Sequence, residues 1–104
     1  MYQLLDPSRF VVFITGATSG FGAAAARRYV AAGGKVIATG RRWDRLVDLQ
    51  IDLGPENCHI VALDVQDRAA IEAAIADLPA PFAGINIVLA NAGLALGLQP
   101  AAET

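Results

Sequence analysis

The chain has 104 residues, of which 55% are hydrophobic and 17% charged, and its formal net charge is −2. This length fits one small domain, and the composition is too apolar for a disordered chain. The acidic balance argues against a nucleic-acid binder, which normally carries a basic surplus. One cysteine and one histidine are too few for a disulfide framework or for a Cys/His metal site.

Hydrophobic stretches are short throughout the chain. None approaches the ~18 consecutive apolar residues that a membrane span needs. The segment before Ser8 has no Lys or Arg, whereas a secretory signal peptide opens with positive charge. We therefore expect a cytoplasmic protein without a membrane partner.

The first predicted pair of elements is a buried strand and a helix. Phe10–Ile14 is a continuous run of aromatic and β-branched residues, which is typical of a strand covered on both faces. Gly20–Ala32 contains four alanines in succession, and alanine is the best helix former. We expect Phe21, Ala25 and Tyr29 to form its apolar face and Gly33 to end it.

A second strand and helix follow in the same order. Lys35–Thr39 is another short apolar strand that ends at Gly40. Trp43–Leu53 has a leucine-rich side, as a helix lying on a sheet requires. Gly54 followed by proline is the usual end of such a helix.

The second half of the chain repeats the pattern. Ile60–Leu63 predicts a third strand, Arg68–Leu78 a helix with Asp67 as its N-cap, and Ile85–Ala90 a fourth strand. Apolar strands that alternate with helices in the order βαβαβαβ predict an α/β fold. We expect a partial Rossmann-type, doubly wound parallel sheet with right-handed crossovers and strand order 3-2-1-4.

The strongest motif lies between the first strand and the first helix. Thr15–Gly22 has the spacing Thr-Gly-x3-Gly-x-Gly in the strand-turn-helix context that a phosphate-binding turn requires. Glycines allow a close backbone approach to a pyrophosphate, and the helix N-terminus points free N–H groups at it. The alternative is a glycine-rich turn that only connects two elements. The candidate cofactor-binding residues here are Gly16, Thr18, Ser19, Gly20, Phe21 and Gly22, and for Ser19 a phosphate contact and a turn-stabilising role are both open.

This spacing resembles that of the short-chain dehydrogenase/reductase family, and two further motifs agree with it. Asp64 and Val65 resemble the acidic element that contacts the adenine. Asn91, Ala92 and Gly93 resemble the element after the fourth strand that supports the sheet and lines the adenosine side. Ala90 replaces the more common Asn at its position. The resemblance covers essentially the whole chain and implies a nicotinamide dinucleotide as cofactor.

The residues after the second strand indicate which dinucleotide is preferred. An NAD site usually places an acid about 20 residues beyond the glycine turn to hold the ribose 2′-OH. Here that place is taken by Arg41 and Arg42, with no acid before Asp44. Because an arginine fork suits a 2′-phosphate, we expect NADP, with Arg41 as the main ligand and Arg42 as a helper. The alternative is that both are solvated charges at a helix start.

Two short segments point to one subgroup of this family. Residues 39–42 and 91–97 are similar to those of NADP-dependent 3-hydroxy acid dehydrogenases, which also oxidise serine and L-allo-threonine. Members of the family use a tyrosine as general acid/base, with a lysine four residues later, and are homo-oligomers, often tetramers. This chain has only Tyr2, Tyr29 and Lys35 for such a pair, and Gly33 lies four residues after Tyr29.

We therefore expect residues 1–104 to be the N-terminal, dinucleotide-binding part of such an enzyme, with the catalytic part absent. The alternative is a standalone nucleotide-binding or regulatory module without catalysis. Ile85–Ala90 carries no charge or proline, so at a sheet edge it favours self-association. For Cys58 and His59 we expect ordinary packing roles rather than reactive or metal-binding ones. For Trp43 we favour packing over stacking near the adenine.

Overall fold

The computed structural model describes residues 6–90. A 3-10 helix, η2 (Pro7–Arg9), leads into four strands and three helices. In chain order these are β1 (Val11–Thr15), α1 (Gly20–Ala31), β2 (Lys35–Gly40), α2 (Trp43–Leu53), β3 (Cys58–Ala62), α3 (Arg68–Ala76) and β4 (Ile87–Ala90), with a short 3-10 helix, η3 (Ala80–Phe82), before β4.

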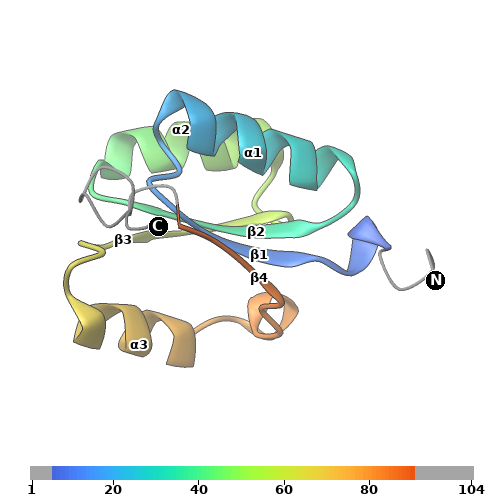
Figure 1. Cartoon of the computed structure of the whole chain (residues 1–104). Coiled ribbons are helices and arrows are strands. Elements are labelled where there is room, and N and C mark those ends of the chain that lie inside the picture. The colour runs from blue at the N-terminus through green and yellow to red at the C-terminus, as the bar shows by residue number, and fades with distance from the viewer. Residues whose placement is uncertain (1–5, 91–104) are drawn as a thin grey trace, which may run out of the picture.

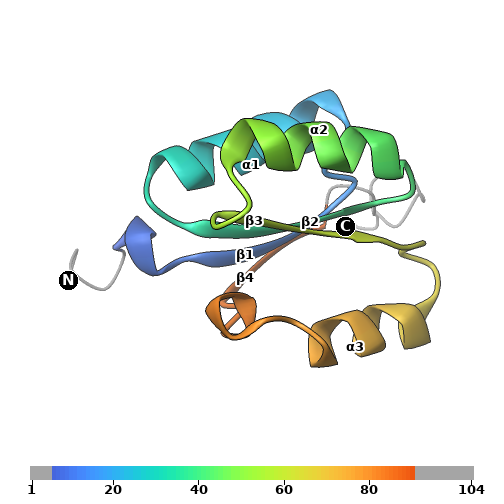
Figure 2. The ribbon, with the colours of Figure 1, turned by 180° about the vertical axis from the view of Figure 1, so that it is seen from behind.

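The four strands form one parallel sheet in the order β3-β2-β1-β4. This confirms the predicted fold class and strand order. Figure 1 shows α1 and α2 side by side on one face of the sheet, with α3 and η3 on the other. Figure 2, from behind, shows the same three layers. All four strands therefore run in one direction and end at the same edge of the sheet.

Two apolar clusters hold these layers together. The larger one joins α1 and α2 to the sheet and includes the fully buried Leu46, Val12 and Val36. The smaller one lies on the opposite face and packs Phe82 of η3 against Phe13 and Ile37. Successive residues of β1 and β2 thus point into different clusters, as the alternation of side chains along a strand requires. This double coverage explains the unbroken apolar runs in the sequence.

The buried face of α1 differs from the prediction. Its buried residues are Gly22 and Ala26, whereas Phe21 is 65% exposed. Small residues bring the helix axis close to the sheet, so the buried stripe runs through them instead of through the large side chains. Tyr29 is half-buried and packs edge to face on Phe10, with ring centroids 6.1 Å apart.

Strand and helix ends shift by one or two residues from their predicted positions. β4 begins at Ile87. Just before it, the Asn86 backbone N–H donates to Val11 O at 3.0 Å, while its side-chain Oδ1 accepts from Val11 N–H at 2.9 Å and its Nδ2 donates to Arg9 O at 3.0 Å. α1 ends as predicted at Gly33, where φ is +99°. The N–H groups of Gly33 and Gly34 bond to Val30 O and Tyr29 O, which is the Schellman arrangement.

Candidate nucleotide-binding site

The glycine turn between β1 and α1 is held by its own hydrogen bonds. Gly16 adopts a φ of +63°, which favours glycine. The Ser19 hydroxyl donates to Gly16 O at 2.9 Å and accepts from Gly22 N–H at 3.1 Å, so Ser19 is the N-cap of α1. The turn-stabilising role considered for Ser19 is therefore present, while its phosphate contact stays a prediction.

Gly20 and Gly22 are glycines for different reasons. A Cβ on Gly22 would lie 2.3 Å from Gly16 O and 2.9 Å from Ala17 Cα, so a side chain there collides with backbone. A Cβ on Gly20 would meet nothing within 4 Å, and Gly20 is exposed at the start of α1. Gly22 thus lets the helix approach the strand, and Gly20 leaves open space beside the first turn of the helix, as a bound phosphate requires.

Contacts between the turn and the end of β2 bring two predicted parts of the site together. Ala17 N–H donates to Thr39 O at 3.0 Å. A Cβ on Gly40 would lie 3.6 and 3.7 Å from the Thr18 side-chain methyl and hydroxyl, so Thr18 covers Gly40. Arg41 follows Gly40 directly and is exposed. The turn and the first arginine after β2 therefore share one corner of the sheet.

Arg42 starts the second helix. It is the N-cap residue of α2, but its side chain makes no capping hydrogen bond. Both Arg41 and Arg42 are exposed, and the first acid after them is Asp44, in the first turn of α2. Both side chains are thus exposed at the carboxyl edge of the sheet, and their contact with a 2′-phosphate stays a prediction.

The end of β3 joins the same edge. Leu63 N–H donates to Gly40 O at 2.8 Å, which continues the β2–β3 pairing and leaves Asp64 exposed just beyond it. One Asp64 carboxylate oxygen accepts from Gln66 N–H at 2.9 Å and stabilises the following turn. Val65 is half-buried. Asp64 therefore lies on the carboxyl edge, as predicted.

The last predicted elements are placed only in part. Ala90, the last residue of β4, pairs with Thr15 at the end of β1. Asn91, Ala92 and Gly93 lie outside the described residues. Within the described part of the chain, the structure brings the glycine turn, Arg41, Arg42 and Asp64 to one edge of the sheet.

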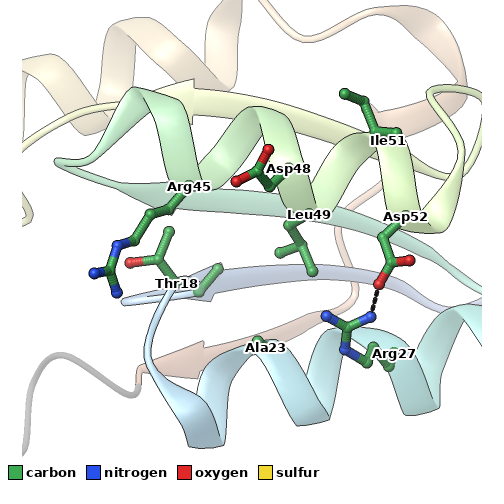
Figure 3. Close-up of a pocket in the computed structure, with 9 residues that line it drawn as sticks. Thr18, Ala23, Arg27, Arg45, Asp48, Leu49, Ile51 and Asp52 are labelled. Carbon is green, nitrogen blue, oxygen red and sulfur yellow. Dashed lines mark hydrogen bonds and ion pairs between the residues drawn. The ribbon is translucent and has the colours of Figure 1, made fainter.

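A pocket between α1 and α2 adds a residue that no sequence motif singles out. It is lined by Thr18 at the turn and by Arg45 of α2, among others (Figure 3). Its far end holds the Arg27–Asp52 ion pair. The only sequence signal for Arg45 is its place four residues after Arg41, in the first turn of α2.

Other chemistries find little support in residues 6–90. No group of three His, Cys, Asp or Glu side chains there is arranged to hold a metal ion. No helix in that range is long and apolar enough to cross a membrane. Cys58 is fully buried in β3, and burial raises the pKa of its thiol to about 11, which makes it unreactive at neutral pH. His59 packs against the ring of Phe82, with centroids 5.5 Å apart.

Trp43 departs from the packing role favoured for it. Its side chain is 54% exposed at the start of α2, next to Arg42. It contributes to neither of the two apolar clusters. The alternative role, stacking near the adenine, stays a prediction.

The structure is an α/β protein with a parallel sheet, and a glycine turn, two exposed arginines and an exposed aspartate lie at the carboxyl edge, where such sheets bind ligands. The family model described as short chain dehydrogenase matches residues 10–104. The chain therefore belongs to the short-chain dehydrogenase family.

Relatives and solved structures agree with this assignment. The NADP-dependent 3-hydroxy acid dehydrogenase YdfG of Escherichia coli O6:H1 is 54% identical over 91 residues, which are 88% of this chain and 36% of that protein. A sulfoacetaldehyde reductase of Chromohalobacter salexigens is 53% identical over 94 residues, which are 89% of this chain and 37% of that protein. The closed form of serine dehydrogenase complexed with NADP+ matches with a TM-score of 0.70 and 52% identity, over 74% of this chain and 31% of that chain. The chain thus spans little more than a third of the length of these curated relatives.

Proposed function

We propose that this chain is the NADP(H)-binding portion of a short-chain oxidoreductase that transfers hydride between NADP and a small 3-hydroxy acid or a hydroxy amino acid such as serine. The observation that carries the proposal is the corner where Thr18 covers Gly40 and Arg41 follows. It joins the glycine turn to a basic group at the place where an NAD site normally has an acid.

The described residues fit the cofactor in three ways. The open space at Gly20 leaves room for a phosphate beside the N–H groups of the first turn of α1. Arg41 and Arg42 supply guanidinium forks for a 2′-phosphate. Asp64, exposed after β3, supplies an acceptor for the adenine side. When bound, the nicotinamide supplies the hydride chemistry, and these residues hold and orient the rest of the dinucleotide.

The substrate class is drawn from the relatives. The relatives named above act, by their names, on 3-hydroxy acids, sulfoacetaldehyde and serine, yet all are 52–54% identical to this chain over the matched part. Identity over the matched part therefore does not distinguish among these substrates. A small polar hydroxy acid or its carbonyl counterpart is the chemistry that these substrates share.

The test is a comparison of binding affinities for NADP+ and NAD+ by titration calorimetry. We expect NADP+ to bind at least about tenfold more tightly, because charge-assisted hydrogen bonds to a phosphate contribute roughly 1.5 kcal/mol or more. Arg41→Asp should remove or reverse this preference, since it places an acceptor where the ribose 2′-OH would lie. Equal affinities in the wild-type protein would refute the proposal.

A second candidate function is a nucleotide-binding or regulatory module without catalysis. The given 104 residues contain no Tyr-x3-Lys pair, which fits both candidates. The association state separates the two candidates. A stable, cooperatively folding monomer of 10.8 kDa would support the standalone module, whereas a marginal, associating chain would support a portion of a larger enzyme.

A further inference from the structure

The pocket between α1 and α2 begins at the glycine turn. Thr18 and Arg45 line one end of it, and Arg27 and Asp52 line the other (Figure 3). Its volume of about 490 Å³ is ample for a phosphate group. The apolar floor between the helices includes Leu49, which is buried. The pocket therefore leads away from the corner where Thr18 covers Gly40.

The two arginines of the pocket differ in their partners. Arg27 forms an ion pair with Asp52, which joins the end of α2 to α1. Among residues 6–90, Arg45 has no carboxylate within ion-pair distance, although Asp48 lies one turn further along α2 and also lines the pocket. Figure 3 shows the Arg45 side chain extending from α2 on the side of Thr18. Arg45 thus holds an unpaired positive charge at the end of the pocket next to the glycine turn.

We infer that Arg45 is a specificity-determining residue for the 2′-phosphate of the dinucleotide, acting together with Arg41. This inference rests on the proposed function. Arg41 leaves the end of β2 next to Gly40, and Thr18 covers Gly40 and shares the pocket with Arg45. Arg41, directly after β2, and Arg45, in the first turn of α2, therefore both lie near the corner at Thr18. A dianionic phosphate is bound more tightly by two guanidinium groups than by one, because each can donate two hydrogen bonds to it.

The decisive variant is Arg45→Gln, which removes the charge and keeps the length of the side chain. Arg9→Gln is the matched control. Arg9 is exposed before β1, at the opposite edge of the parallel sheet, and its loss changes the net charge equally. Affinities for NADP+, NAD+, 2′,5′-ADP and 5′-AMP are measured by titration calorimetry at fixed ionic strength, and far-UV circular dichroism establishes that each variant is folded.

We expect Arg45→Gln to lower the affinities for NADP+ and 2′,5′-ADP about tenfold and to change the affinities for NAD+ and 5′-AMP less than about twofold. Arg9→Gln should change each of the four affinities less than about twofold. Arg45→Lys should recover part of the loss, because it restores the charge without the fork. The slope of NADP+ affinity against salt should also become shallower in Arg45→Gln.

The outcomes separate this inference from the proposed function. A wild-type protein that binds NADP+ and NAD+ equally overturns the proposed function and this inference with it. A wild-type preference for NADP+ that Arg41→Asp removes and Arg45→Gln leaves intact overturns the role of Arg45 alone. An equal loss of affinity for all four ligands in Arg45→Gln also overturns the role of Arg45, because a structural role would affect the whole site.

Discussion

At the scale of single residues, the shape of the glycine turn depends on the absence of a side chain at each glycine. Gly16 provides a left-handed backbone at the end of β1, and Gly22 allows α1 to touch the carbonyl of Gly16. Gly20 is not needed for the folding of the turn, because nothing lies near the place of its missing Cβ. The motif Thr-Gly-x3-Gly-x-Gly therefore combines two glycines that the backbone requires with one, Gly20, beside which the structure leaves open space.

This difference predicts opposite results for two alanine variants. Gly22→Ala should lower the free energy of unfolding by about 1–3 kcal/mol, since the new Cβ meets backbone that cannot rotate away. Gly20→Ala should leave stability unchanged or slightly higher, because alanine favours a helix, and should weaken nucleotide binding. Urea denaturation and titration calorimetry measure the two effects. Unaltered stability of Gly22→Ala, or full nucleotide affinity of Gly20→Ala, would contradict the roles assigned here.

At the scale of elements, β4 is the least covered strand among the described residues. It is the outer strand of the sheet, next to β1, and Val88 at its centre is 65% exposed. Ile87 and Leu89, which alternate with Val88, pack partly against the larger apolar cluster. An outer strand with unpaired backbone groups and no charged side chain is a site for pairing with another chain.

We therefore predict that this chain by itself associates through β4 and that Val88→Lys reduces the association. The substitution should cost little stability, because the side chain of Val88 is mostly in solvent. Ile51→Lys is the control, since Ile51 is 72% exposed on α2 and the same charge is gained away from the edge. Light scattering after size exclusion gives the mass. Equal effects of the two variants would show that the association is non-specific.

At the scale of the whole molecule, the described part has a nucleotide-type edge and no proton-transfer pair. Tyr29 packs on Phe10 and lies in α1, and Lys35 donates to Glu56 O at 2.8 Å at the start of β2. These two residues therefore belong to different elements with separate structural tasks. Within residues 6–90 these two residues thus form no Tyr-x3-Lys pair, and nucleotide binding at the carboxyl edge of the sheet stays a prediction.

We accordingly expect the 104-residue chain to show no oxidation of serine or of 3-hydroxy acids with NADP+ above a blank without protein. A missing general acid/base alone removes a factor of about 10²–10⁴. The assay is the appearance of NADPH absorbance. Turnover that co-purifies with the chain and survives Tyr29→Phe would require a different mechanism.

The order of elements and the parallel sheet were readable from the amino-acid sequence, and the ends of the helices to within one or two residues. These features follow from local patterns, such as apolar runs for buried strands and Gly33 at the end of α1. The candidate residues after β1, β2 and β3 were readable for the same reason, because parallel strands end at a common edge. The use of those residues in binding is still a prediction.

Only the tertiary structure decided which side chains meet across that edge. The buried face of α1 runs through Gly22 and Ala26, and Asn86 joins β1 through its side-chain amide as well as its backbone N–H. Thr18 covers Gly40 at the end of the next strand and shares a pocket with Arg45. Such contacts depend on the distance between helix and sheet, which is set by the packing of small residues and leaves no periodic signal in the sequence.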